Sequence, residues 1–219
     1  MRGALEVKFC GLTRAEDARL AAELGARYVG VIFAGGPRLV TPAGAAALLP
    51  PAAVGLRRVG VFGAQGAAEI AATAEAVPLD VVQLHADPTP VDIDAVRNVW
   101  PGPVWAAVRV GGAELPRGAR DVFRAADAVV LDARVPGRLG GTGVALEWAR
   151  LRDAVDRLRE GRVLVLAGGL TPDNVAAAAD VLAPDVVDVS SGVERAPGIK
   201  DHARMCAFAA AARPRGVER

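Results

Sequence analysis

Cysteine is scarce in this chain, and its two copies are far apart. Among 219 residues only Cys10 and Cys206 carry a thiol, and they lie near opposite ends of the sequence. Two distant cysteines provide neither a disulfide framework nor the close ligand spacing of a zinc site. We therefore expect neither a stabilising disulfide nor a structural metal.

A charge imbalance and long apolar runs are also missing. The 26 basic and 25 acidic residues leave a net charge of +1, which does not favour a nucleic-acid or membrane surface. No stretch approaches the roughly 18 uninterrupted apolar residues of a membrane span. Residues 1–8 contain no apolar run of the signal-peptide kind. We expect a cytoplasmic protein with no nucleic-acid or membrane partner.

Three familiar catalytic motifs do not occur in the sequence. It has no Walker A loop, no H-E-x-x-H and no G-x-S-x-G, which removes the NTPase, zincin and α/β-hydrolase classes. What the chain does have is apolar residues, at 52% of the total, enough for one globular domain with a large core. We expect that domain to span residues 1–219, with a frayed tail at 213–219.

Short β-rich apolar runs alternate with longer alanine- and leucine-rich stretches along the whole chain. The predicted strands are 7–10, 28–33, 58–62, 80–85, 104–108, 128–132, 163–167 and 186–189. Eight such repeats predict an α/β fold, a single (β/α)₈ TIM barrel. An open doubly wound sheet is the competing arrangement, but it accounts less well for eight regular repeats without a second domain.

Helix starts and ends can also be predicted from local motifs. Thr13 with Glu16 matches a T-x-x-E capping box for a helix at 15–24, and Thr41-Pro42 and Thr171-Pro172 each pair a cap with a first-turn proline. Further helices are predicted at 67–76, 114–125, 146–160 and 199–212.

Polar side chains lie near the carboxyl ends of several predicted strands. They are Lys8 and Cys10 on the first strand, Gln83 and His85 on the fourth, Asp132 on the sixth and Asp188 on the eighth. Side chains alternate along a strand, so these groups should share the upper lumen of a barrel, where parallel α/β enzymes place their chemistry. Singly, each could be a strand-end or ion-paired residue: Cys10 a buried hydrophobe, and Lys8 the partner of a lumen carboxylate.

Glycine- and serine-containing loops follow the last three predicted strands. They contain Gly141 and Gly143 after the sixth strand, Gly168 and Gly169 after the seventh, and Ser190, Ser191 and Gly192 after the eighth. Loops seven and eight of such barrels often bind phosphate through backbone N–H groups. Ordinary turn chemistry is the alternative for any one of these loops.

Taken together, these segments resemble the phosphoribosylanthranilate isomerase family over nearly the whole chain. The segments that carry the resemblance are Lys8-Phe9-Cys10-Gly11-Leu12-Thr13, Pro37-Arg38, Val82-Gln83-Leu84-His85, Leu131-Asp132, Gly140-Gly141-Thr142-Gly143, Ala167-Gly168-Gly169-Leu170-Thr171-Pro172-Asp173-Asn174, Asp188-Val189-Ser190-Ser191-Gly192-Val193-Glu194 and Pro197-Gly198-Ile199-Lys200-Asp201. Ala86 and Leu146-Glu147 depart from the family pattern without removing a catalytic group.

The resemblance implies an Amadori rearrangement in tryptophan biosynthesis. N-(5-phosphoribosyl)anthranilate would become 1-(2-carboxyphenylamino)-1-deoxyribulose 5-phosphate, with Asp132 as general acid and Cys10 as general base. Arg38 would bind the anthranilate carboxylate, Asp188 a hydroxyl or amine, and Gln83 and His85 would line the site. The reaction is redox-neutral and hydrolyses nothing, so no cofactor or metal is expected.

Both catalytic groups would need shifted pKa values. The pKa of Cys10 should fall from about 8.5 towards neutrality, helped by Lys8 and the following helix start, and that of Asp132 should rise from about 3.9. A non-catalytic phosphosugar-binding barrel, or another phosphosugar isomerase or lyase on the same fold, is the alternative. The sequence leaves open whether the protein is a monomer or a homodimer.

Overall fold

Eight parallel strands form a closed barrel in the computed structural model, which describes residues 4–49, 55–133 and 147–213. Each strand pairs with the next, and β8 pairs with β1 to close the ring. The strands are β1 (Glu6–Phe9), β2 (Tyr28–Ile32), β3 (Arg57–Phe62), β4 (Val81–Leu84), β5 (Val104–Val110), β6 (Ala128–Ala133), β7 (Val163–Leu166) and β8 (Val186–Val189). The predicted (β/α)₈ barrel is therefore confirmed, and the open sheet is excluded.

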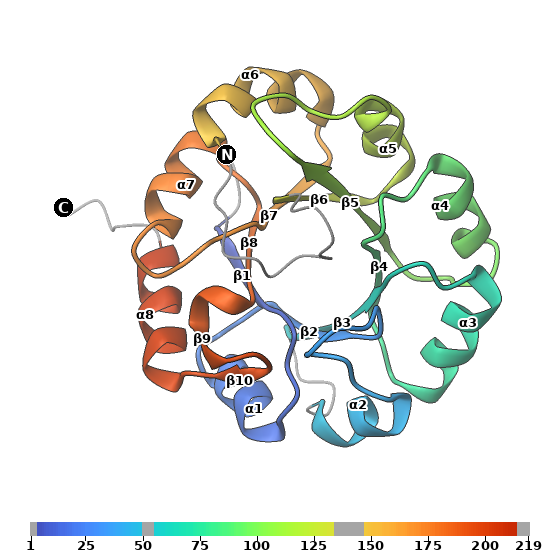
Figure 1. The fold of residues 1–219 in the computed structure, drawn as a ribbon, viewed down its shortest axis with the longest axis vertical. Helices are drawn as coiled ribbons and strands as arrows, with labels where there is room; N and C mark the ends of the chain where they lie inside the picture. The colour runs from blue at the N-terminus through green and yellow to red at the C-terminus, as the bar shows by residue number, and fades with distance from the viewer. Residues whose placement is uncertain (1–3, 50–54, 134–146, 214–219) are drawn as a thin grey trace.

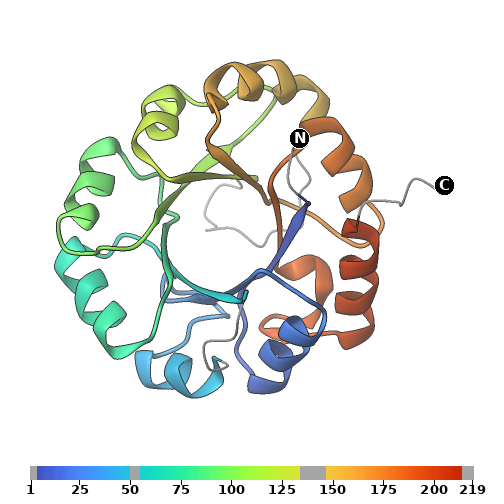
Figure 2. The same ribbon diagram turned by 180° about the vertical axis from the view of Figure 1, so that it is seen from behind.

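A ring of helices surrounds the barrel, as both end-on views show (Figures 1 and 2). The helices are α1 (Ala15–Glu23), α2 (Pro42–Leu48), α3 (Ala67–Ala76), α4 (Pro90–Arg97), α5 (Ala119–Ala125), α6 (Trp148–Arg159), α7 (Val175–Leu182) and α8 (His202–Ala212). Among the described residues, none of these helices is both long and apolar enough to cross a membrane.

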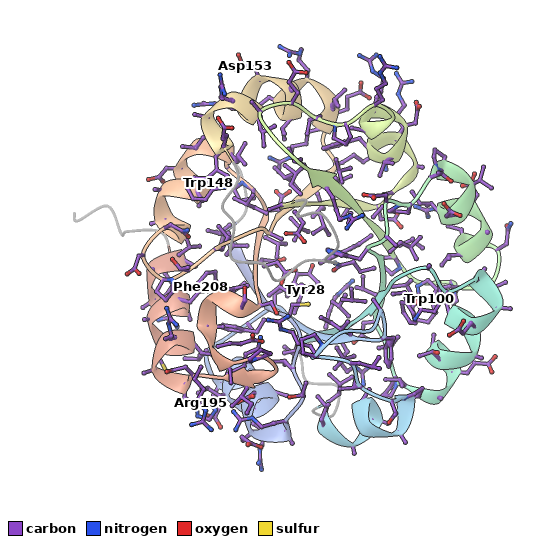
Figure 3. All side chains as sticks on the ribbon, in the orientation of Figure 1. Tyr28, Trp100, Trp148, Asp153, Arg195 and Phe208 are labelled. Carbon is purple, nitrogen blue, oxygen red and sulfur yellow. The ribbon has the colours of Figure 1, made fainter. Side chains whose placement is uncertain are left out.

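Apolar side chains pack in two layers, one on each face of the barrel wall. The outer layer joins strands to helices, where Phe208 of α8 meets Phe9 of β1 edge-on at 6.1 Å between ring centroids. The inner layer fills the lumen, with Tyr28 and Trp105 edge-on at 4.8 Å. Figure 3 shows Tyr28 inside the ring and Phe208 on its helix. The packed lumen forms a floor, so polar groups above it are held at the carboxyl ends of the strands.

Two predicted helix caps are wrong because their residues make other contacts. Thr13 does not cap α1, although the helix begins at Ala15 as predicted; its hydroxyl donates to the carbonyl of Gly198, and the N-cap residue is Arg14 without a side-chain cap bond. Thr171 does not cap α7, because its backbone N–H donates to Asn174 and the helix begins only at Val175, three residues after Pro172. Thr41, in contrast, caps α2 as predicted by accepting from the N–H of Gly44.

A short hairpin takes the place of the first turn predicted for the last helix. Residues 199–200 form β10 (Ile199–Lys200), paired antiparallel with β9 (Glu194–Ala196), which follows the 3₁₀ turn η1 (Ser191–Val193). Helix α8 therefore begins only at His202, after Asp201 caps it. The predicted helix at 114–125 is also shorter, since α5 starts at Ala119. The start of the 146–160 helix and most of the 213–219 tail lie outside the described residues.

Candidate active site

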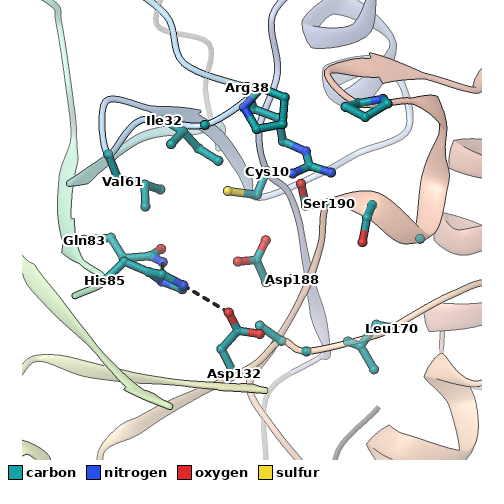
Figure 4. Close-up of a pocket in the computed structure, with 18 of the residues that line it drawn as sticks. Cys10, Ile32, Arg38, Val61, Gln83, His85, Asp132, Leu170, Asp188 and Ser190 are labelled. Atoms are coloured by element: carbon teal, nitrogen blue, oxygen red, sulfur yellow. Dashed lines mark hydrogen bonds and ion pairs between the residues drawn. The ribbon is translucent and has the colours of Figure 1, made fainter. Parts of the chain in front are cut away.

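A pocket of about 640 Å³ opens at the carboxyl ends of the strands and collects nearly all the predicted site residues (Figure 4). The predicted residues that line it are Cys10, Arg38, Gln83, His85, Asp132, Gly168, Gly169, Asp188, Ser190, Ser191 and Gly192. Gly141 and Gly143 lie outside the described residues, so their predicted role is not addressed by the structure. One pocket thus unites groups from seven of the eight βα units.

Cys10 lies directly above β1 with its thiol in the lumen, where it is only 6% exposed. Its backbone is held on two sides: its N–H donates to the carbonyl of Val189 and its own carbonyl accepts from Lys200. Gly30 of β2 leaves room for the sulfur, because a Cβ at that position would lie 2.9 Å from Sγ. A glycine inside a strand marks such a close approach.

Burial raises the pKa of the Cys10 thiol above its usual value. The ammonium groups of Lys8 and Lys200 lower it, but they do not offset burial, and Asp188 adds to the upward shift. The expected fall towards neutrality is therefore wrong for the free protein.

Lys8 and Asp188 form a buried ion pair across the adjacent strands β1 and β8. Nζ of Lys8 lies 2.6 Å from Oδ2 of Asp188, and the two residues are directly paired in register. Burial would lower the pKa of Lys8, but the Asp188 carboxylate raises it, so Lys8 stays charged. The other oxygen, Oδ1, is buried without a hydrogen-bond partner among the described residues. Asp188 therefore keeps one acceptor for a ligand in the pocket.

His85 connects Gln83 to Asp132. Its Nε2 lies 3.0 Å from Oδ2 of Asp132, and its Nδ1 lies 3.2 Å from Nε2 of Gln83. Because the Gln83 amide nitrogen can only donate, Nδ1 is the acceptor and the ring proton is on Nε2, pointing at Asp132. The second Asp132 oxygen accepts from the backbone N–H of Ala133 at 2.8 Å. Both carboxylate oxygens of Asp132 are thus held in place by these contacts.

Arg38 reaches the pocket from the β2–α2 loop, but it is not a free cation. Its Nε and Nη2 bind the two carboxylate oxygens of Glu194 at 2.8 and 2.6 Å. The predicted substrate-binding arginine therefore arrives already oriented by a carboxylate on the β8–α8 loop. The hydrogen bonds to Glu194 raise the pKa of Arg38.

The loops after β7 and β8 touch each other through glycine. A Cβ on Gly192 would lie 1.8 Å from the carbonyl oxygen of Leu170, so no larger residue fits there. Gly168 has φ of +80°, and a Cβ on it would lie 2.6 Å from the backbone nitrogen of Ala133. This close approach brings Ser190, Ser191 and the two glycine turns to one side of the pocket, as an anion-binding site made of backbone N–H groups requires.

The sequence pattern did not identify three residues of the site as functional groups. Gly30, Glu194 and Lys200 all contact a predicted site residue, but none lies at a strand tip. The glycine within a strand was a usable signal for the first. Glu194 and Lys200 were visible only as part of a family-like segment, since their partners are distant in sequence.

The fold and site together define a (β/α)₈-barrel enzyme that moves protons on a small anionic substrate. A thiol, a carboxyl–imidazole pair and a carboxyl–ammonium pair face one pocket beside glycine-rich loops. No group of three histidine, cysteine, aspartate or glutamate side chains among the described residues could hold a metal ion.

Comparison with known proteins identifies the family. Residues 7–211 match the family model described as N-(5'-phosphoribosyl)anthranilate (PRA) isomerase. The protein of that name from Acidithiobacillus ferrooxidans is 40% identical over 95% of this chain and 98% of its own length. A crystal structure of phosphoribosyl anthranilate isomerase from Thermotoga maritima has a TM-score of 0.82 at 36% identity, covering 95% of this chain and 98% of its own. The chain therefore belongs to the N-(5'-phosphoribosyl)anthranilate isomerase family.

Another solved structure of the same enzyme includes a ligand. It contains reduced 1-(o-carboxyphenylamino)-1-deoxyribulose 5-phosphate, and it matches this chain with a TM-score of 0.78 at 34% identity over 95% of the chain. That ligand combines a phosphate, a sugar-derived chain and an aromatic carboxylate.

Proposed function

We propose that this protein catalyses the Amadori rearrangement of N-(5-phosphoribosyl)anthranilate to 1-(2-carboxyphenylamino)-1-deoxyribulose 5-phosphate in tryptophan biosynthesis. The observation that carries the proposal is the placement of Cys10 and Asp132 on opposite walls of one pocket, within a chain of this family (Figure 4). Turnover of freshly generated substrate, followed by the loss of anthranilate-type fluorescence, tests it. Ligand binding without turnover would favour a non-catalytic phosphosugar-binding barrel instead.

Asp132 is the proposed general acid for ring opening. It gives a proton to the furanose ring oxygen, the bond from that oxygen to C1′ breaks, and the amine nitrogen supplies electrons to form a protonated Schiff base. His85 holds the carboxyl group from one side and the Ala133 N–H holds it from the other. The role requires that the Asp132 carboxyl group carry a proton when it meets the furanose ring oxygen.

Cys10 is the proposed general base for the second step. Its sulfur takes the C2′ proton, the electrons of that C–H bond neutralise the iminium as an enolamine, and tautomerisation then gives the ketone. A base must be ionised to act, and the neighbouring ammonium of Lys8 stabilises the thiolate once it forms. The atoms balance as an isomerisation, so the mechanism calls for no cofactor or metal.

The rest of the pocket holds the ends of the substrate. The residues proposed to bind the substrate phosphate are Gly168, Gly169, Ser190, Ser191 and Gly192 from the loops after β7 and β8, together with Gly141 and Gly143 after β6. Oδ1 of Asp188 and Oε1 of Gln83 have no hydrogen-bond partner in the part of the chain that the structure describes. The first accepts from a sugar hydroxyl or the amine, and the second is a further acceptor. Arg38 binds the ring carboxylate.

Replacing Arg38 with methionine should raise KM by about ten- to a hundredfold and change kcat little, because charged hydrogen bonds are worth about 1.5–3 kcal/mol. Steady-state kinetics measures this split. Arg195→Met, which removes an exposed arginine on the β9–β10 hairpin, is the matched control and should behave like the wild type. An unchanged KM in Arg38→Met would remove the proposed role in carboxylate binding.

The kcat/KM of the wild type should rise with pH through neutrality and continue rising above about 8.5, the ordinary thiol value. The sign follows from burial, which raises the pKa of Cys10 in the free enzyme, so the thiolate fraction grows only at alkaline pH. A pH series of kcat/KM measures this, with Cys206→Ala as a thiol control. A plateau reached well below pH 8 would contradict it.

Three further expectations belong with this function. The substrate is a small phosphosugar, and the site is built for one ligand of that size rather than for nucleic acid. We infer a cytoplasmic location from the biosynthetic role. The protein is a monomer or a homodimer, a question that sedimentation or light scattering answers directly.

A further inference from the structure

The orientation of Arg38 depends on a single carboxylate. Glu194 binds Nε and Nη2 of the guanidinium, which occupies one of its two flat edges. A guanidinium presents five N–H donors in a rigid fork, so the edge containing Nη1 remains for a second carboxylate. Because both bonds to Glu194 are short, Arg38 cannot rotate without breaking them. The direction of the remaining edge is therefore set by Glu194.

Glu194 is itself rigidly held. Its Oε1 also accepts from Nζ of Lys200 at 2.9 Å and from the backbone N–H of Gly198 at 3.3 Å. The side chain of Glu194 is 5% exposed and that of Lys200 is fully buried. Burial would raise the pKa of Glu194, but its hydrogen bonds to Arg38 and Lys200 lower it, so it remains anionic.

Lys200 links this pair to the reacting groups. Its ammonium donates to the carbonyl of Cys10 at 2.6 Å and to that of Ser190 at 3.0 Å. The same side chain therefore touches the loop of the proposed base and the loop proposed to bind phosphate. Arg38 is thus connected, through Glu194 and Lys200, to both of these loops.

The charges of the group are also suited to an anionic ligand. The group contains two basic side chains, Arg38 and Lys200, and one carboxylate, Glu194, and burial lowers the pKa of Lys200. Only Arg38 of the three lines the pocket, so a ligand meets the positive charge of its guanidinium. A ligand carboxylate at the open edge would pair with that charge.

We propose that Glu194 is a positioning residue. It orients the free edge of the Arg38 guanidinium toward the carboxylate of the substrate's aromatic ring, and so sets the preference of the enzyme for a carboxylated aromatic amine. The inference rests on the proposed function, in which Arg38 binds that carboxylate. Glu194 does not touch the substrate; it acts through Arg38. Its contribution is to hold the guanidinium in the binding orientation before the substrate arrives, which reduces the ordering cost of binding.

The test uses two ligands that differ only in the ring carboxylate. These are reduced 1-(o-carboxyphenylamino)-1-deoxyribulose 5-phosphate and its 1-phenylamino counterpart, with dissociation constants measured by titration calorimetry. Glu194→Gln should weaken the carboxylated ligand by about tenfold, in line with the loss of one charged hydrogen-bond pair. The uncarboxylated ligand should bind within about twofold of its wild-type affinity, and KM should rise more than kcat falls.

A second variant guards against a folding defect. Glu194→Asp keeps the charge beside Lys200, but its side chain is one methylene too short to reach Nε and Nη2 of Arg38. It should therefore show the same selective loss of affinity for the carboxylated ligand. Glu75→Gln, on an exposed part of α3, should show none. Equal weakening of both ligands in both Glu194 variants would overturn the proposal, since a merely structural role affects each ligand alike.

Arg38→Met separates this inference from the proposed function. If it abolishes the preference for the carboxylated ligand while the Glu194 variants retain it, Arg38 binds the carboxylate and the role of Glu194 is refuted. If Arg38→Met leaves the preference intact, the carboxylate-binding role of Arg38 itself is refuted, and the Glu194 inference is refuted with it.

Discussion

Cys10→Ala should lower kcat by about 10² to 10⁴, the usual worth of a proton transfer by a positioned side chain. The expected cause is loss of the base that takes the C2′ proton, because no other thiol lines the pocket among the described residues. Single-turnover kinetics with freshly generated substrate would measure the loss. The affinity for the reduced product analogue should stay close to wild type, since the substitution only removes a sulfur atom.

Cys206→Ala is the matched control for this substitution. Cys206 is exposed on α8, away from the pocket, so its loss should leave kcat and KM unchanged. Wild-type rates in Cys10→Ala would refute the base assignment and would turn attention to Asp188, the nearest carboxylate that the pocket contains.

Asp132→Asn should lower kcat by a similar factor of about 10² to 10⁴. Asparagine has the shape of aspartate and its amide oxygen can still accept from His85, but it has no acidic proton to give to the ring oxygen. The single amide oxygen cannot also replace the second carboxylate oxygen, so the bond from the Ala133 N–H is lost, which should destabilise the fold by only about 1 kcal/mol. Steady-state kinetics and a thermal melt measure the two effects separately.

Asp94→Asn, on the exposed side of α4, tests whether removing any carboxylate slows the enzyme. It should have no effect on turnover. If Asp132→Asn keeps most of the wild-type kcat, ring opening needs no acid at this position. A drop in KM together with kcat would point instead to altered ligand binding.

The predicted barrel and most of its site residues followed from features that are local in the chain. Eight alternating apolar repeats favour a closed α/β arrangement, and the period of two along each strand places Gln83, His85 and Asp188 on the inner face. Val130 and Val186, two positions before Asp132 and Asp188, pack in the lumen, as the same alternation requires. The motif order also pointed to the family to which the chain belongs.

Local motifs failed where a distant residue competed for the same group. Thr13 matches a capping box, yet its hydroxyl bonds to Gly198, 185 positions away. Residues 199–200 have a sequence compatible with a helix start but pair with β9 instead. In both cases the competing partner is on the hairpin after β8, whose position depends on closure of the barrel.

The sequence alone was enough to predict the barrel and the side chains that meet at its carboxyl rim, because strand periodicity and loop order place side chains without reference to partners. The proposed roles of Asp132 and Cys10 come from the family resemblance. Only the tertiary structure decided their electrostatics. Burial, rather than the nearby Lys8, sets the direction in which the pKa of Cys10 shifts. Glu194, rather than a ligand, occupies one edge of the Arg38 guanidinium. Depth of burial and salt-bridge partners depend on residues that are distant in sequence, so they become visible only when β8 closes on β1.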